Sequence, residues 1–253
     1  MINKQLILIS GVTGSLGEAY LEHYRNSEKR VAGISRSQPK IPYTDVQYLK
    51  ANLLDPNQSK RCMDKLSLEG ITELVLIHPV GRFKFEKNFT EVNPEIYASN
   101  VETLTNLVNP LLKRQEKPSI TLVAFGSISD KYEVPFWRSY SKSKNALRKY
   151  IHELADKEEK IKGVFINLSS VRTRNESILR PYANTRYWIT PEEIVQRSVP
   201  ELSPTEKWKE IDIFNLSPDY SPTIYTNHSA VLKRWTEEMH GENQNNHKKL
   251  YKQ

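Results

Sequence analysis

The stretch Gln5-Leu6-Ile7-Leu8-Ile9-Ser10 runs directly into Gly11-Val12-Thr13-Gly14-Ser15-Leu16-Gly17, and this junction decides the fold. Its first half is a nearly continuous apolar run, which is typical of a strand buried on both faces of a parallel sheet. The chain contains only 9 glycines, yet three of them stand together at positions 11, 14 and 17. A glycine-rich turn between an apolar run and an amphipathic stretch predicts a strand, a tight turn and a helix in succession.

Short β-branched or apolar runs alternate with longer amphipathic stretches along the rest of the chain. This alternation predicts repeated β-α-β units, and therefore an α/β fold with a Rossmann-type, doubly wound parallel sheet of about seven strands and helices on both faces. We expect strands at Gln5–Ser10, Arg30–Ser35, Val46–Ala51, Glu73–His78, Ile120–Gly126, Lys162–Leu168 and Glu210–Leu216. We expect helices at about Ser15–Asn26, Gln58–Leu66, Pro94–Arg114, Trp137–Glu158 and Pro191–Leu202.

The bulk composition predicts one globular domain. With 253 residues, 38% hydrophobic and 26% charged, the chain can bury a substantial core, and no linker or internal repeat divides it. We expect a single domain over residues 1–240 and a polar, disordered tail over residues 241–253. No apolar run has the roughly 18–20 residues that span a bilayer, so we expect no membrane partner. The apolar run near Met1 is too short for a signal peptide and Cys62 is the only cysteine, so we expect a cytoplasmic protein.

The chain has a formal net charge of +7. Its cations are scattered and form no block of five or six like charges, which argues against nucleic acid as the main partner. Small anionic ligands explain the basic balance better.

The glycine turn at residues 11–17 is where a phosphate-bearing ligand is expected. Glycine permits a tight turn and lets the backbone approach a pyrophosphate, while the N-terminus of the following helix attracts the phosphate charge. Such a turn alone is common in ordinary loops, but its position between a strand and a helix favours dinucleotide binding. The residues that we assign to this part of the site are Ser10, Gly11, Thr13, Gly14, Ser15, Leu16 and Gly17.

The end of the second strand predicts which dinucleotide is bound. An acidic residue there favours NAD, whereas an arginine accommodates the 2′-phosphate of NADP. This chain reads Ser35-Arg36-Ser37, which offers a cation and two hydroxyl groups and no acid. NADP(H) is therefore the expected cofactor, with a solvated loop arginine as the alternative. After the third strand, Asn52, Leu53 and Asp55 are expected to flank the adenine.

The expected chemistry lies on the helix that begins near Trp137. Tyr140 is followed four residues later by Lys144, so that both side chains share one helix face. A phenol is a poor acid–base catalyst at neutral pH, and an adjacent cation favours its ionised form. Ser127 stands at the carboxyl end of the preceding strand, where open α/β sheets bind ligands, with Ser129 as a possible competitor.

This arrangement resembles the short-chain dehydrogenase/reductase family, in which a glycine turn is followed by an active-site serine and then by Tyr-x-x-x-Lys. The turn from Ser10 to Gly17 is similar to the family's Thr-Gly-x-x-Gly-x-x-Gly variant, and the resemblance covers roughly residues 5–216. Asn100 stands where the family has its fourth active-site residue.

The resemblance implies a role for each matching residue. Tyr140 would exchange a proton with the substrate oxygen, and Lys144 would lower the phenol's pKa and bind the nicotinamide ribose. Ser127 would orient the carbonyl group, and Asn100 would support a proton relay through water. Hydride would pass directly between nicotinamide and substrate. No metal is implied, and no metal-ligand spacing of Cys or His is present.

The chain departs from the family pattern after two strands, which indicates a divergent member. His78-Pro79-Val80-Gly81 stands where the family has Asn-Asn-Ala-Gly. His78 is interpreted as a packed, hydrogen-bonded substitute, with an acid–base role as the alternative, and both His78 and Pro79 are placed beside the cofactor. Around residues 168–173 the family's Pro-Gly pair is missing, and we expect Ser170 and Thr173 to contact the nicotinamide.

Residues 172–189 are the expected substrate loop. Four arginines (172, 174, 180 and 186) are interleaved there with aromatic residues, which would suit a carbonyl or alcohol substrate bearing a carboxylate or phosphate. The alternative is that these arginines solvate a mobile lid or bind the cofactor phosphates.

The sequence therefore predicts an NADPH-dependent oxidoreductase, a carbonyl reductase that acts on a ketone or aldehyde of a small metabolite. Two alternatives remain, a nucleotide-sugar epimerase or dehydratase of the same family and a non-catalytic NADP(H)-binding regulator or scaffold. The long helices Pro94–Arg114 and Trp137–Glu158 resemble the family's usual dimer surface, so a homodimer or homotetramer is expected.

Overall fold

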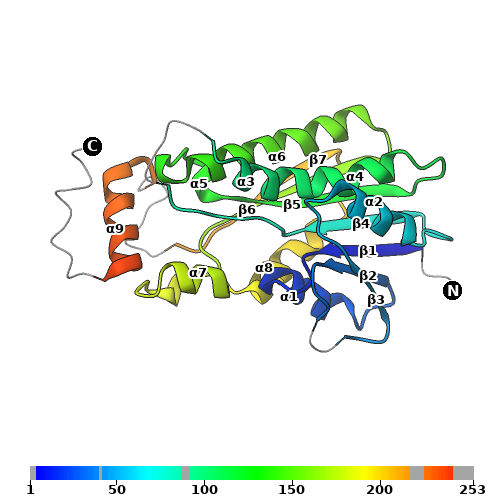
Figure 1. The fold of residues 1–253 in the computed structure, drawn as a ribbon, viewed down its shortest axis with the longest axis horizontal. Helices are drawn as coiled ribbons and strands as arrows, with labels where there is room; N and C mark the ends of the chain where they lie inside the picture. Colours follow the sequence, from blue (N-terminus) through cyan, green and yellow to red (C-terminus); the bar gives the residue numbers. More distant parts are fainter. Residues whose placement is uncertain (1–3, 40–41, 87–91, 217–224, 242–253) are drawn as a thin grey trace.

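A seven-stranded parallel sheet with the order β3-β2-β1-β4-β5-β6-β7 forms the centre of the molecule (Figure 1). The computed structural model describes residues 4–39, 42–86, 92–216 and 225–241. The strands are β1 (Gln5–Ser10), β2 (Arg30–Ser35), β3 (Val46–Lys50), β4 (Glu73–His78), β5 (Ser119–Ser127), β6 (Ile161–Leu168) and β7 (Trp208–Ile213). The sheet confirms the predicted fold class.

The strands are connected mainly by helices. The longer ones are α1 (Ser15–Tyr24), α2 (Pro56–Lys65), α4 (Thr103–Leu112), α6 (Arg138–Lys157), α8 (Pro191–Ser198) and α9 (His228–His240). The short ones are α3 (Pro94–Tyr97), α5 (Ile128–Lys131), α7 (Arg174–Leu179), the π-helix η1 (Ala98–Glu102) and the 3₁₀ turns η2 (Pro135–Trp137), η3 (Thr185–Tyr187) and η4 (Val199–Glu201). Among the described residues, no helix is long and apolar enough to cross a membrane.

The helices lie in two layers, with α2, α4 and α6 on one face of the sheet and α1 and α8 on the other (Figure 1). Each layer closes its own apolar core. Leu104 of α4 and Leu147 of α6 pack on one face, while Tyr20 of α1 and Ile194 of α8 pack on the other. Because both faces are covered, the central strands β1 and β4 read as continuous apolar runs.

The order of the strands reverses at β1, which pairs with β2 on one side and with β4 on the other. At such a point the connections leave in opposite directions, and a crevice opens at the carboxyl ends of the strands. The glycine turn at residues 11–17 and the segment after His78 both begin at this edge. The fold therefore brings together the segments that carry the predicted site.

Two predicted helices are interrupted, each for a local reason. The helix expected at Pro94–Arg114 continues as α3, η1 and α4, and in η1 the side chain of Asn100 donates to the backbone oxygen of Ile96 at 2.9 Å. The helix expected at Pro191–Leu202 tightens into η4 after Ser198, because Pro200 has no N–H for an α-helical bond.

The strand predicted at Glu210–Leu216 lies earlier, at Trp208–Ile213, and α9 was not predicted. The helix α9 begins after Asn227, whose side chain accepts from the N–H of Ala230, and ends at Gly241 with φ 82°. Apart from Gly241, the predicted tail lies outside the described residues. Figure 1 shows α9 at the end of the molecule opposite the N-terminus, beside the carboxyl ends of β5 and β6.

Gly17 lies very close to the backbone of Gly11, and this close approach generates a first prediction. A Cβ atom at Gly17 would lie 2.3 Å from the carbonyl oxygen of Gly11, whereas one at Gly14 would lie 3.3 Å from the same oxygen. We expect Gly17→Ala to lower the free energy of unfolding by about 2–3 kcal/mol through overpacking. Gly14→Ala should cost less than about 1 kcal/mol. Urea unfolding compares the two, and equal losses would contradict the close contact.

Candidate active site

The glycine turn presents an open helix N-terminus. Gly11 adopts φ +67°, and the N–H groups of Gly11 and Val12 donate to the Ile34 oxygen of β2 at 2.6 and 3.3 Å. Gly14 is the N-cap of α1 and has no side chain to occupy the first N–H groups of the helix. Thr13 and Gly14 are exposed, while Ser15 and Leu16 are partly exposed in the first turn. The backbone donors and the positive end of the helix dipole are therefore arranged as an anion would require.

Ser10 and His78 bond each other beneath the surface. Both are buried, with Ser10 Oγ 2.7 Å from His78 Nδ1 and His78 Nε2 3.1 Å from Thr103 Oγ1. Burial, reinforced by the charge of Lys144, lowers the pKa of His78 to about 3. The ring is neutral at physiological pH, and both of its nitrogens are hydrogen-bonded. This geometry agrees with the interpretation of His78 as a packed, hydrogen-bonded residue. Pro79 is half-buried directly after it.

The residues assigned to the adenosine end follow β2 and β3. Arg36 and Ser37 are exposed, and the hydroxyl of Ser35 donates to the backbone oxygen of Ser37. Within the described part of the chain Arg36 forms no ion pair, so its guanidinium faces solvent. Asn52 is exposed and its side-chain oxygen accepts from the N–H of Leu54, whereas the side chain of Leu53 belongs to the core. Leu53 could therefore face a ligand only through its backbone.

Tyr140, Lys144 and Ser127 are brought together by α6 and the end of β5. The Lys144 Nζ lies 5.4 Å from the centre of the Tyr140 ring, one helical turn away. Ser127 ends β5 and interacts with the Tyr140 phenol through its side chain. Ser129, the competitor considered from the sequence, is buried and donates its hydroxyl to Ser127 Oγ at 2.9 Å. Ser127 is therefore the serine whose side chain acts on Tyr140, and Ser129 supports it.

Burial controls the protonation of Tyr140 and Lys144. The expectation that Lys144 lowers the pKa of Tyr140 is not met: burial raises this pKa, and the negative charges of Asp130 and Glu176 raise it further, against a smaller lowering by Ser127. The pKa of Lys144 is lowered to about 8 by burial, which Asp130 partly offsets. Near neutral pH the Tyr140 phenol keeps its proton, and Lys144 is charged in most molecules. The pair is therefore prepared to donate a proton rather than to accept one.

Asn100 binds the backbone that follows β4. Its Oδ1 accepts from the N–H of Arg82 at 3.2 Å, and its Nδ2 donates to the oxygens of Arg82 and Ile96, both at 2.9 Å. A Cβ atom at Gly81 would lie 2.3 Å from Asn100 Oδ1 and 3.3 Å from Lys144 Nζ. Asn100 therefore fixes the loop against Lys144 and has its side-chain amide engaged by protein. Its part in a water relay stays a prediction.

The segment after β6 carries Ser170, Thr173 and a buried arginine. Ser170 accepts from Arg180 Nη2 at 2.8 Å, and Thr173 is the N-cap of α7, accepting from the N–H of Glu176. Arg180 also pairs with Glu176 and, at 2.8 Å, with Glu238. Its guanidinium carbon lies 4.7 Å from the ring centre of Trp188 and 4.0 Å from that of Trp235.

Arg180 differs from the other three arginines of the predicted substrate loop. It is 2% exposed and has two carboxylate partners, so it joins the loop to α9 and does not solvate a lid. Arg172, Arg174 and Arg186 are exposed and remain candidates for an anionic ligand.

An aromatic cluster that the sequence analysis missed covers Tyr140. The Phe83 ring meets Tyr140 edge-on at 5.2 Å, and Trp235 of α9 lies 5.5 Å from Phe83 and 4.3 Å from Trp137. The buried positions Val231 and Trp235 are four residues apart after the Asn227 cap, and this spacing could have revealed α9.

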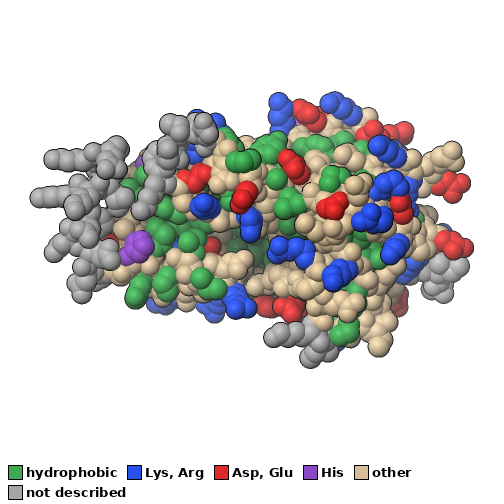
Figure 2. Space-filling model, in the orientation of Figure 1, with side chains coloured by type: hydrophobic (Ala, Val, Ile, Leu, Met, Phe, Trp, Pro, Cys, Tyr) green, Lys and Arg blue, Asp and Glu red, His purple; other side chains and the backbone are tan. Residues whose placement is uncertain are grey.

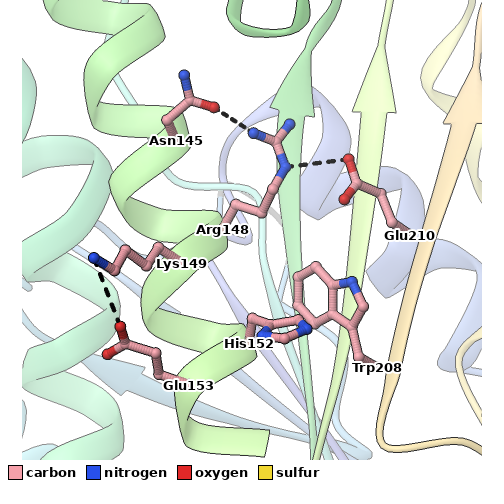
Figure 3. A pocket seen from close by; sticks show the side chains of 7 residues that line it. All are labelled: Asn145, Arg148, Lys149, His152, Glu153, Trp208 and Glu210. Atoms are coloured by element: carbon pink, nitrogen blue, oxygen red, sulfur yellow. Dashed lines mark hydrogen bonds and ion pairs between the residues drawn. The ribbon is translucent and has the colours of Figure 1, made fainter.

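Two hollows are present in the described part of the surface, one beside α6 and the other after β6. A surface groove of about 400 Å³ lies between α6 and β7, and most of its polar lining residues are bonded to one another (Figure 3). Arg148 bonds Asn145 and Glu210, and Lys149 pairs with Glu153. A smaller hollow of about 140 Å³ is lined by Ser170, Arg180 and Trp188, among others. The second hollow lies beside the predicted substrate loop.

The charge on the visible face is mixed. Lys and Arg side chains are spread over this face and interspersed with Asp and Glu (Figure 2). Within the described residues, no group of three or more His, Cys, Asp and Glu side chains is placed to hold a metal ion.

Comparisons with known proteins connect this geometry to solved structures. No protein-family model matches the chain, and no curated protein matches its sequence. A short-chain dehydrogenase from Burkholderia cenocepacia in complex with NADP has a similar structure, with a TM-score of 0.70 and 17% identity, over 93% of this chain and 98% of that one.

Two further solved structures are similar. The 3-ketoacyl-(acyl-carrier-protein) reductase of Brucella melitensis, complexed with NADH, has a TM-score of 0.66 and 16% identity over 85% of this chain and 98% of that one. The ligand-free aldohexose dehydrogenase of Thermoplasma acidophilum has a TM-score of 0.66 and 16% identity over 83% of this chain and 93% of that one. The chain therefore has the fold of the short-chain dehydrogenases/reductases, with a strongly divergent sequence.

The three hydrogen bonds of the Asn100 side chain generate a second prediction. We expect Asn100→Ala to lower the free energy of unfolding by about 2–3 kcal/mol, because buried bonding groups lose their partners. Asn106→Ala is the matched control, since the Asn106 amide donates a single described bond, to Leu53 at 2.9 Å, and should cost about 1 kcal/mol. Urea unfolding of both variants gives the difference. Equal losses would mean that Asn100 does not hold the loop.

Proposed function

We propose that this protein is a nicotinamide-dependent oxidoreductase of the short-chain dehydrogenase/reductase type, which reduces a ketone or aldehyde of a small metabolite with NADPH. The observation that carries the proposal is the meeting of Tyr140, Lys144 and Ser127 at the carboxyl edge of the sheet. Close contacts after β4 connect these three residues to the glycine turn. A Cβ atom at Gly11 would lie 2.9 Å from Val80, and Gly81 lies against Lys144.

The residues present fit a dinucleotide. The open N-terminus of α1 offers backbone donors to the pyrophosphate, and the exposed Arg36 and Ser37 offer a cation and a hydroxyl to a 2′-phosphate. Lys144 and the backbone near Gly81 would face the nicotinamide end. A side chain at Gly81 would overlap Asn100, so the backbone there approaches its neighbours closely.

When bound, the nicotinamide supplies the hydride that reduces the substrate carbon. The Tyr140 hydroxyl donates its proton to the carbonyl oxygen, so that hydride and proton together convert the carbonyl group to an alcohol. The Lys144 cation stabilises the phenolate that remains, and the Ser127 hydroxyl donates a hydrogen bond that orients the carbonyl oxygen. The raised pKa of Tyr140 supports reduction, because the phenol starts protonated.

The nature of the substrate is also part of the proposal. The exposed Arg172, Arg174 and Arg186 would attract a carboxylate or phosphate, while Phe83 and Trp235 would contact the apolar part of the molecule. We further propose a homodimer or homotetramer that forms through α4 and α6.

A non-catalytic NADP(H)-binding protein is the second candidate. Phe83 packs on Tyr140 and Glu176 raises its pKa, so the phenol is enclosed by the protein's own side chains. A fluorescence titration with NADPH followed by a screen of carbonyl substrates separates the two functions. Tight binding without turnover would favour the second candidate, and binding of neither NADPH nor NADH would contradict both.

The role of Tyr140 generates a third prediction. Tyr140→Phe should lower kcat by at least about 100-fold, which is typical of the loss of general acid catalysis, and leave the Kd for NADPH within about twofold. Steady-state kinetics and fluorescence titration measure the two quantities. Tyr97→Phe is the control, because Tyr97 is exposed and lies outside the proposed site, and it should change neither. Unchanged turnover in Tyr140→Phe would exclude the assigned role.

The preference for NADPH generates a fourth prediction. Arg36→Asp should raise the Kd for NADPH by at least about 30-fold, since it removes a charge-assisted contact and adds repulsion, and change the Kd for NADH less than about threefold. Isothermal titration of both cofactors at one salt concentration is the measurement. An equal effect on both cofactors would show that Arg36 does not contact the 2′-phosphate.

A further inference from the structure

A buried carboxylate, Asp130, lies directly behind the proposed catalytic residues. It is the third residue of α5, and its Oδ1 accepts from the N–H of Ser127 at 2.6 Å. In return, Ser127 Oγ accepts from the N–H of Ser129 at 3.2 Å, which completes a capping box. Asp130 is 2% exposed. The loop that carries Ser127 is therefore fastened by a carboxylate that water does not reach. Burial raises the pKa of Asp130, and the charge of Arg148 and the bond from the Ser127 N–H act against this rise.

Arg148 holds this carboxylate in place. Its Nη2 lies 2.5 Å from Asp130 Oδ2 and 3.0 Å from Asn167 Oδ1, and its Nε lies 3.1 Å from Glu210 Oε1. Asn167 in turn donates to Glu210 and Asp212 at 2.7 and 2.8 Å. Arg148 is thus fixed by α5, β6 and β7 together, and Figure 3 shows its guanidinium pointing from α6 toward Glu210.

The geometry of α6 connects this ion pair to the reaction. Tyr140, Lys144 and Arg148 are spaced four residues apart, so they follow one another along one face of the helix. The carboxylate of Asp130 pairs with Arg148 and also acts electrostatically on Lys144 and Tyr140. A buried ammonium is costly without a nearby negative charge.

The other groups near these side chains do not replace Asp130. Lys144 also faces His78 of β4, which is neutral, and the amide oxygen of Asn100 across Gly81. Tyr140 also faces Glu176 of α7, whose carboxylate is paired with Arg180, and Ser127. Among the described groups that act on Lys144, Asp130 is the carboxylate that favours its charged form.

We propose that Asp130, clamped by Arg148, is a positioning residue that fixes the Ser127 loop and keeps Lys144 charged for the transfer of the Tyr140 proton. The inference rests on the proposed function for its effect on turnover. Its electrostatic part concerns the folded protein alone, because the carboxylate acts on Lys144 whether or not a substrate is reduced.

The first test measures Lys144 directly. In protein labelled with ¹³C at the lysine ε-carbon, an NMR titration gives the pKa of Lys144, whose signal is assigned from its loss in Lys144→Met. Asp130→Asn keeps the size of the side chain and removes its charge, and it should lower the pKa of Lys144 by roughly one unit. An unchanged pKa would overturn the proposal independently of any enzymatic activity.

The second test measures turnover with NADPH and a carbonyl substrate found in the screen. Asp130→Asn should lower kcat at pH 8 by about fivefold, because a fall of one unit from a pKa of about 8 takes the charged fraction of Lys144 from about a half to about a tenth. The basic limb of the pH profile should move to lower pH, with the Kd for NADPH unchanged. Loss of the carboxylate lowers the pKa of Tyr140 as well as that of Lys144, so both effects have the same direction. A uniform fall in kcat without a shift of the limb would indicate a merely structural role and overturn the proposal.

Variants of Arg148 keep the test decisive if Asp130→Asn does not fold. Arg148→Met should reproduce both shifts, since a buried carboxylate without its cation takes up a proton, and Arg148→Lys should restore most of kcat. Lys149→Met is the matched control, because Lys149 is the next residue on α6 and is exposed. Equal pKa values of Lys144 in Arg148→Met and Lys149→Met would overturn the role of the clamp. Failure of the native protein to turn over any substrate would instead contradict the proposed function and leave the Lys144 titration interpretable.

Discussion

The pairing of β1 with β2 on one side and β4 on the other is the constraint on which the rest of the structure depends. Because β1 is the point where the strand order reverses, the loops after β1 and β4 leave the same edge and close on each other at Gly11 and Val80. The segment after β4 then reaches Lys144 through Gly81. A displacement of β1 would therefore disturb both the glycine turn and the catalytic group.

The cost of burying polar groups explains much of the detail around the site. His78 is accommodated as a neutral ring between Ser10 and Thr103, and Lys144 is accommodated as a cation near Asp130. The two solutions are linked, because the charge on Lys144 further disfavours a charged His78. The protonation of His78 and that of Lys144 therefore depend on each other.

The sequence predicted those parts of the molecule that depend on local patterns. The bounds of β1, β2 and β4 agree with the predicted ones, because buried parallel strands are continuous apolar runs that end at turns. The four-residue spacing of Tyr140 and Lys144 predicted a common helix face, which is also a local pattern. Contacts between distant segments were not predictable. Trp235 meets Trp137, and Arg180 meets Glu238, across many residues that carry no common pattern.

The roles of individual polar residues also depend on tertiary structure. Ser10 is part of the glycine turn in sequence, but its hydroxyl is drawn into the sheet by His78. Asp130 reads as an ordinary polar residue beside Ser127, and only the fold places Arg148 against it.

The position of α9 has a consequence for biosynthesis. Since the ribosome makes the chain from its N-terminus, the sheet and the glycine turn can form early, while the aromatic cover of Tyr140 is completed only when Trp235 has emerged. An unfinished chain would thus expose an uncovered Tyr140 and Phe83, so the enclosed site is built by the last described helix to be synthesised.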